Sequence, residues 1–197
     1  RNQHLIMTHI DNGTIDYRDE LVRKLIHLFS LSIPIIYYFI PSSTSIAILF
    51  GLTIFALVVD GGRFISKSFA KIFYQAFGFL LRKHELDKEK KNLTGATYVL
   101  LSALICALIF PKVIFVTAFT ILIISDTTAA LIGRKFGKRK FLRKSFEGTL
   151  SFFISASIVV FFTPKVADFP MEYMIGFLAA FVGAIVENIS YGFADDN

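Results

Sequence analysis

The chain has 197 residues, of which 54% are hydrophobic and 23 are phenylalanine, and its formal net charge is +6. One small soluble core cannot bury that much apolar surface, and the 18% of charged residues lie in clusters between apolar runs. These features exclude a disordered chain, a coiled coil and an ordinary soluble enzyme. They predict a single integral-membrane domain over residues 1–197.

The N-terminal segment, residues 1–20, is polar and has no apolar stretch close to its basic start. We therefore expect no cleavable secretory signal, although a chain that begins with Arg is expected to have been trimmed. Cys106 is the single cysteine and lies in an apolar run, so it forms neither an intrachain disulfide nor a cysteine zinc cluster. Its expected role is packing.

Six apolar stretches approach the ~20 residues that span a hydrocarbon core. They cover residues 22–40, 43–60, 93–110, 113–133, 147–163 and 171–190. Each is expected to be a helix, because lipid offers the backbone no hydrogen-bond partners. The predicted fold class is an all-α, polytopic membrane protein with about six transmembrane helices and one interfacial amphipathic helix.

Orientation follows from the basic residues, because cytoplasmic connections carry an excess of Lys and Arg. Residues 1–24 and the connections 61–92 and 134–146 hold 19 of the 21 Lys and Arg residues, whereas Lys112 and Lys165 alone fall on the other side. Both termini are therefore predicted to be cytoplasmic. The sequons at Asn12, Asn92 and Asn188 then face the cytoplasm or lie in a helix, and we expect no glycosylation there.

The segment from Arg63 to Arg82 interleaves apolar residues with Lys67, Lys71 and Gln75. This pattern predicts an amphipathic helix in the cytoplasmic interface. It fits either a surface helix attracted to anionic lipid or a lid over the place where lipid reaches a site.

Ionisable residues inside predicted spans are costly and are functional candidates by default. Asp126 follows a nearly unbroken apolar run, and Glu187 lies near the cytoplasmic end of the last span. Packing of a paired carboxylate is the alternative for both. Asp195 and Asp196 lie just beyond that last helix, where an ordinary solvated tail is the alternative.

The densest basic connection lies on the same side as these carboxylates. It runs Gly133-Arg134-Lys135-Phe136-Gly137-Lys138-Arg139-Lys140 and then Lys144-Ser145-Phe146-Glu147-Gly148-Thr149. Carboxylates hold Mg²⁺ together with substrate phosphates, whereas Lys and Arg neutralise phosphate. Two glycines allow backbone N–H groups to approach phosphate, and Ser145 is placed to cap the fifth span. Both halves of a nucleotide site are thus present, although positive-inside topology alone also fills such loops with Lys and Arg.

Polar residues also mark the ends of other spans. Arg23, Lys24 and His27 open the first span, with Arg23 and His27 one turn apart, where they either anchor the helix at the headgroups or act in a site. Thr94-Gly95 and the run Asp60–Arg63 are each expected to be a helix cap or a turn.

The long run from Ser125-Asp126-Thr127-Thr128 through Gly133, Gly137 and Lys138, followed by Lys144-Ser145-Phe146-Glu147-Gly148-Thr149, resembles the signature of the CTP-dependent lipid kinases. This family includes dolichol kinase, phytol kinase and the CTP-using diacylglycerol kinase. The opening Arg23-Lys24-x-x-His27, the pair Thr94-Gly95, and Glu187 followed by Asp195-Asp196-Asn197 match it in type and order. The resemblance covers residues 20–197.

The resemblance implies transfer of the γ-phosphate of CTP, with Mg²⁺, to the hydroxyl of a membrane lipid alcohol such as diacylglycerol, phytol or a polyprenol. It implies that Asp126 binds metal or accepts the hydroxyl proton, with Glu187, Asp195 and Asp196 completing the metal or base set. It assigns triphosphate binding to Lys135, Lys138 and Lys144, and assigns shaping of the phosphate loop to Gly133, Gly137, Ser145, Gly148 and Thr149. Arg23, Lys24 and His27 would close the site, and Glu147 would orient a lysine, ligate metal or begin the helix.

The chain departs from the family pattern in one respect, and two alternative functions remain. Family members usually continue past Asp-Asp-Asn into another apolar helix, whereas this chain ends at Asn197. The phosphatidate cytidylyltransferases are similar, but their loop has a Ser-Pro-Lys-Lys-Thr type sequence where Arg143-Lys144-Ser145 stands here. An alternative of another class is a small transporter that uses Asp126 and Glu187 as a relay. The expected partners are CTP, the lipid alcohol and the bilayer, with no nucleic acid and an open oligomeric state.

Overall fold

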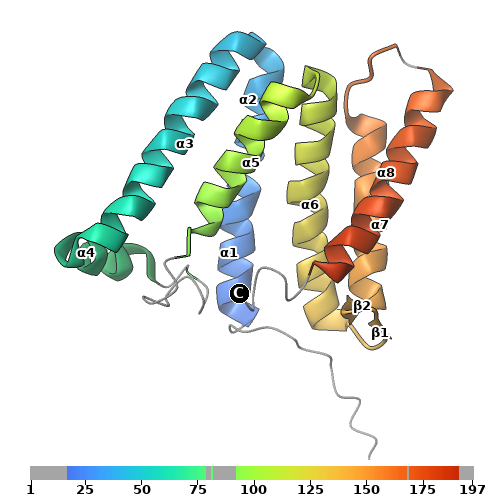
Figure 1. Cartoon of the computed structure of the whole chain (residues 1–197). Helices are drawn as coiled ribbons and strands as arrows, with labels where there is room; N and C mark the ends of the chain where they lie inside the picture. The colour runs from blue at the N-terminus through green and yellow to red at the C-terminus, as the bar shows by residue number, and fades with distance from the viewer. Residues whose placement is uncertain (1–16, 79–80, 82–91, 168, 191–197) are drawn as a thin grey trace, which may run out of the picture. The chain divides into compact units, whose positions relative to one another are not determined.

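The computed structural model describes residues 17–78, 81, 92–167 and 169–190. Within them the fold is all-α apart from one short β-hairpin (Figure 1), which confirms the all-α fold class predicted from the apolar stretches. The elements in chain order are α1 (Tyr17–Phe29), α2 (Ser32–Phe39), α3 (Ser42–Ile65), α4 (Lys67–Phe77), α5 (Gly95–Ile109), α6 (Lys112–Phe136), β1 (Lys140–Phe141), β2 (Lys144–Ser145), α7 (Phe146–Phe162) and α8 (Pro170–Ile189).

Four helical segments are long and apolar enough to cross a membrane. They are Glu20–Phe39, Ser42–Ile65, Lys112–Phe136 and Pro170–Ile189. The apolar helices α5 and α7 are shorter, with 15 and 17 residues, against the ~20 that a full crossing needs. Composition and helix length together indicate a membrane protein.

The described residues form two compact units. The first unit comprises the described residues of 14–119 and the second those of 120–197, so that the division falls within the continuous helix α6. Each unit has its own packing and is described by itself.

In the first unit, α3 lies beside α5 and is joined to α4 by a single residue (Figure 1). Proline explains the break between α1 and α2, because the ring of Pro34 would clash with the carbonyl of residue 30 in an unbroken helix. Tyr37 of α2 is buried against Phe115, with ring centroids 4.4 Å apart. The ammonium of Lys112 donates a hydrogen bond to the carbonyl of Ile40 at 2.8 Å.

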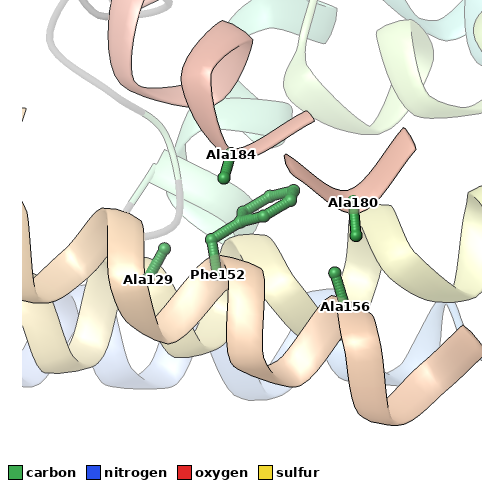
Figure 2. Packing of buried hydrophobic residues seen from close by; sticks show 5 residues of the cluster. All are labelled: Ala129, Phe152, Ala156, Ala180 and Ala184. Atoms are coloured by element: carbon green, nitrogen blue, oxygen red, sulfur yellow. The ribbon is translucent and has the colours of Figure 1, made fainter. Parts of the chain in front are cut away.

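Small residues build the core of the second unit, where α7 packs along α8 (Figure 2). The ring of Phe152 lies among four buried alanines, Ala129, Ala156, Ala180 and Ala184. A Cβ added at Gly176 would come within 2.5 Å of Val160, so only glycine permits this helix contact. Small residues on α8 therefore allow it to approach α7 closely.

Two helices run further than their apolar stretches. α3 continues to Ile65 instead of ending at residue 60, so the prediction of a cap or turn at Asp60–Arg63 was wrong. α6 continues to Phe136, which makes Gly133 and Lys135 helical rather than part of a loop. The backbone hydrogen bonds of a helix do not depend on side-chain polarity, so a change of composition does not mark the last turn.

Candidate functional site

A β-hairpin holds the basic connection between α6 and α7. Lys140 pairs with Ser145 and Phe141 with Lys144 in antiparallel register, and the amide of Phe146 donates to the carbonyl of Arg139 at 2.8 Å. At the tip, Leu142 has a φ of 51°. This left-handed conformation is unfavourable for a residue that has a Cβ atom. No alternating pattern in this part of the chain is long enough to predict these two-residue strands.

Ser145 caps α7, as predicted. Its hydroxyl accepts the N–H of Gly148 at 3.2 Å and donates to the carbonyl of Gly133 at 3.5 Å. A Cβ added at Gly133 would lie 3.0 Å from that hydroxyl, and one at Gly137 would overlap the Gly133 carbonyl and Ser145. A Cβ at Gly148 would lie 3.0 Å from the carbonyl of Ala129. These glycines therefore bring the end of α6 against the start of α7.

Glu147, in the first turn of α7, holds the segment that leads into the hairpin. Its carboxylate accepts the backbone N–H groups of Lys138 at 3.0 Å and of Arg139 at 3.3 Å. Glu147 thus begins α7, which is one of the three roles considered for it, and it also holds the backbone of the basic segment.

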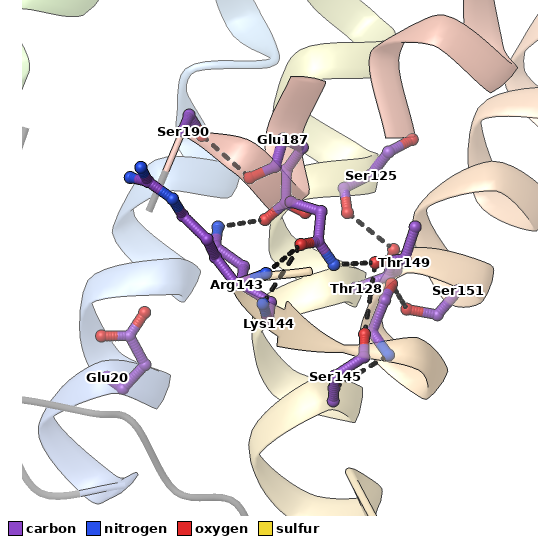
Figure 3. A network of polar contacts seen from close by, with 12 residues as sticks. Glu20, Ser125, Thr128, Arg143, Lys144, Ser145, Thr149, Ser151, Glu187 and Ser190 are labelled. Atoms are coloured by element: carbon purple, nitrogen blue, oxygen red, sulfur yellow. Dashed lines mark hydrogen bonds and ion pairs between the residues drawn. The ribbon is translucent and has the colours of Figure 1, made fainter. Parts of the chain in front are cut away.

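Lys144, in the second strand of the hairpin, forms an ion pair with an acidic side chain. Its ammonium lies 2.5 Å from Oε1 of Glu187, near the end of α8 (Figure 3). Both side chains are largely shielded, with 29% of Lys144 and 11% of Glu187 exposed. The second oxygen, Oε2 of Glu187, is buried and has no hydrogen-bond partner among the described residues. Lys135 and Lys138 are exposed.

Asn188 is the residue that sequence reasoning missed. It is fully buried, and its side-chain oxygen accepts the backbone N–H of Arg143 at 2.9 Å and of Lys144 at 3.1 Å. Its amide nitrogen donates to Thr149 Oγ1 at 2.5 Å, and that hydroxyl donates to the carbonyl of Ser145 at 3.2 Å. One side chain of α8 thus ties the turn and the second strand of the hairpin to the first turn of α7. An asparagine inside an apolar span is the signal that could have found it.

Asp126 belongs to the same unit as this network. It is half-buried on α6, between the buried side chains of Ser125 and Thr127. The next residue, Thr128, shares a hydrogen bond of 2.9 Å with Ser155 of α7, which fixes this turn of α6 against its neighbour (Figure 3).

The expected metal set is only partly within the described residues. Asp195 and Asp196 lie outside them. Among the described side chains, no three from His, Cys, Asp and Glu gather into a group that would hold a metal ion. Mg²⁺, however, is commonly held by one or two carboxylates together with substrate phosphates and water. The buried, unbonded Oε2 of Glu187 fits such a ligand.

The residues expected to close the site lie in the first unit. The guanidinium of Arg23 pairs with the carboxylate of Glu20 at 2.8 Å, a partner that the sequence analysis did not consider. Lys24 is buried and His27 is half-buried on the same helix, α1. These three residues are therefore grouped with one another on α1.

A second buried polar network lies in the first unit, between α3 and α5. Oδ2 of Asp60 accepts the backbone N–H of Thr94 at 2.8 Å and the hydroxyl of Thr97 at 2.7 Å. Its Oδ1 lies 2.9 Å from Nε of Arg63, and the Arg63 guanidinium donates to the carbonyl of Asn92. Thr94 caps α5, as one of the two predictions for Thr94-Gly95 had it. The carboxylate of Asp60 thus joins the end of α3 to the start of α5.

The chain is similar to a known protein over most of its length. An uncharacterized protein of Rickettsia prowazekii (strain Madrid E), RP860, is 32% identical to the chain over 152 residues, which are 76% of this chain and 74% of that protein. The chain belongs to the same family as RP860. No family model matches the chain, and no solved structure matches it. The chemistry of this family therefore has to be argued from its side chains.

Proposed function

We propose that the chain is a CTP-dependent lipid kinase, which transfers the γ-phosphate of CTP to the hydroxyl of a membrane lipid alcohol. The observation that carries the proposal is the contact of Lys144 with Glu187, in which the cation of a braced hairpin meets a carboxylate at the end of a candidate span. Phosphate binding needs the first group, and metal binding needs the second.

Bracing matters because phosphoryl transfer depends mainly on positioning and on neutralising charge. The hairpin is held from two directions, by Asn188 at Arg143 and Lys144 and by Glu147 at Lys138 and Arg139. A flexible loop of lysines would have to be ordered when the nucleotide binds, whereas this one is ordered beforehand. The exposed Lys135 and Lys138 complete a positive surface beside the hairpin.

In the proposed reaction, the lipid oxygen attacks the γ-phosphorus of CTP. A new phosphorus–oxygen bond forms as the bond to the bridging β–γ oxygen breaks, and CDP leaves. Asp126 would either accept the hydroxyl proton or hold Mg²⁺, in which case the proton would pass to water. Oε2 of Glu187, which has no hydrogen-bond partner among the described residues, would be a ligand for Mg²⁺ in either case. Mg²⁺, when bound, neutralises charge on the phosphate oxygens. Lys144 then exchanges its carboxylate partner for a phosphate oxygen.

The proposed topology places this chemistry at the cytoplasmic face. All six apolar helical segments cross the bilayer, α5 and α7 with the help of residues that reach the interface, and α4 lies in the interface. The concentration of Lys and Arg in three connections supports cytoplasmic termini. A lipid alcohol has its hydroxyl at headgroup level, which is where CTP arrives from water.

The proposal is tested with the purified full chain reconstituted in phosphatidylcholine, given Mg²⁺, CTP or ATP, and a mixture of diacylglycerol, phytol and polyprenol. Phosphorylated lipid is separated by chromatography. We expect product with CTP, and a loss on the order of 10³-fold in Asp126→Asn. Glu172→Gln is the matched control, because this carboxylate accepts the amides of Val166 and Ala167 in the segment before α8. Full activity in Asp126→Asn would contradict the proposed role.

A further inference from the structure

Helix α4 has three distinct sides. Successive residues of an α-helix are about 100° apart, so residues spaced by three and four positions share a side. Lys67, Lys71 and Gln75 form an exposed polar stripe. An exposed apolar stripe lies next to it, made by Phe69, Ile72 and Ala76, and no residue of α4 is fully buried.

The third side packs back on α3. The Arg63 guanidinium lies 5.5 Å from the centre of the Phe73 ring. Phe69, at the edge of the apolar stripe, also approaches α3, because a Cβ added at Gly62 would be 3.3 Å from its ring. Ser66 ends α3 in an extended conformation and caps α4 by accepting the N–H of Phe69 at 3.3 Å. The helix therefore turns sharply away from α3 in a fixed direction (Figure 1).

Arg63 is itself held firmly, which fixes α4 in turn. It is only 4% exposed and is paired with Asp60, which is 1% exposed and bonded to Thr94 and Thr97. The contact with Phe73 thus connects α4 to the packed pair α3 and α5. This anchoring argues against the alternative in which α4 is a mobile lid on a flexible hinge.

Two observations identify what covers the exposed apolar stripe. The stripe follows directly on Ser42–Ile65, which is long and apolar enough to cross a membrane, and the last residue of that segment, Ile65, is 89% exposed. Ile72, in the middle of the stripe, is 66% exposed. The neighbouring stripe carries two lysines and no acidic residue, in a chain of net charge +6.

We propose that α4 is a fixed membrane-surface helix that binds anionic phospholipid headgroups through Lys67 and Lys71, with Phe69, Ile72 and Ala76 in the bilayer interface. An apolar face next to a basic face is the arrangement by which helices lie in an interface. The inference rests on the proposed crossing of the bilayer by α3, and it is independent of the kinase activity.

The test uses the full chain with Cys106→Ala and one new cysteine, Ile72→Cys or Gln75→Cys, carrying an environment-sensitive fluorophore. The protein is reconstituted in vesicles of phosphatidylcholine alone or of phosphatidylcholine with phosphatidylglycerol, with and without lipid brominated on its acyl chains. We expect bromine to quench the label at position 72 and iodide in water to quench the label at position 75. The anionic lipid should increase the quenching at position 72.

Charge is tested in the same vesicles. Each lysine near an anionic surface favours the bound state by about fivefold, so Lys67→Gln with Lys71→Gln should remove the effect of phosphatidylglycerol, whereas the two Lys→Arg changes should retain it. High salt on the unsubstituted helix should act like the Gln variant. A label at Phe55→Cys, on the exposed apolar side of α3, reports whether each variant is still inserted. Equal responses at positions 72 and 75, or an effect of phosphatidylglycerol that survives high salt, would overturn the proposal.

Discussion

The ammonium of Lys144 lies 2.5 Å from the carboxylate of Glu187, although 43 residues separate the two in sequence. Both side chains are more than two-thirds shielded from solvent, so the pair is part of the packed structure and differs from an ordinary surface ion pair. It brings the basic hairpin to the end of α8. The proposed reaction depends on this meeting of a phosphate-binding cation with a metal-binding carboxylate.

The first prediction concerns this pair. Lys144→Met should lower kcat/KM for CTP by roughly 10²-fold or more, because a positioned charge on the phosphate is lost. Glu187→Gln should lower activity at least as much, since it removes a carboxylate that the proposal uses for the metal. Lys140→Met, in the adjacent strand and exposed, is the matched control and should have a small effect. Equal effects at Lys140 and Lys144 would show that only the overall charge of the hairpin matters.

The second prediction concerns Asn188. Asn188→Ala leaves the part-buried N–H groups of Arg143 and Lys144 without their acceptor, and each unsatisfied group costs up to about 1 to 3 kcal/mol. We expect a lower melting temperature and a raised KM for CTP, because the hairpin is no longer ordered before the nucleotide binds. Ser190→Ala, two residues further along at the C-cap of α8, removes an exposed hydroxyl and should change neither the melting temperature nor the KM. An unchanged KM in a folded Asn188→Ala protein would exclude the bracing role.

The third prediction concerns backbone strain at Leu142. Glycine adopts a φ near 51° at no steric cost, so Leu142→Gly should raise the free energy of unfolding by about 1 kcal/mol. Leu142→Ala retains a Cβ and should bring no such gain. Thermal unfolding of the three proteins in the same detergent measures the difference. Equal melting temperatures for the Gly and Ala variants would show that the residue is not strained.

The fourth prediction concerns the buried pair of Asp60 and Arg63. Removing one charged partner should destabilise the chain by about 3 to 5 kcal/mol, because the other charge stays buried without compensation. Asp60→Leu combined with Arg63→Met should cost clearly less than the sum of the two single changes. Ser102→Ala, an exposed position on α5, serves as the control. Strict additivity in thermal unfolding would contradict a direct coupling.

Much of the fold was predictable because burial in an apolar solvent leaves a helix as the only economical backbone for a long apolar run. The cap at Ser145 was predictable as well, since a hydroxyl before an apolar run satisfies a free backbone N–H. The ends of α3 and α6 were not, because their final turns are polar and still helical.

The site was less predictable than the fold. Sequence spacing marked Lys144 and Glu187 as separate candidates, but only the packing of α7 on α8 brings them together. Asn188 stands out in the sequence as a polar residue inside an apolar span, but its partners do not. Asn188 and Glu147 both accept backbone N–H groups, and such partners leave no pattern in the sequence. Only the tertiary contacts show which groups they hold.

The most direct test of the central claim is the fate of each phosphate of CTP. The full chain in phosphatidylcholine vesicles, with Mg²⁺, the mixture of lipid alcohols and added phosphatidate, is incubated with CTP labelled at the γ-phosphate or, separately, at the α-phosphate. A lipid kinase puts only the γ label into the extracted lipid, and the labelled species identifies its alcohol. The α label in lipid would contradict the claim in favour of a cytidylyltransferase, and no label in lipid from either nucleotide would contradict it in favour of a transporter.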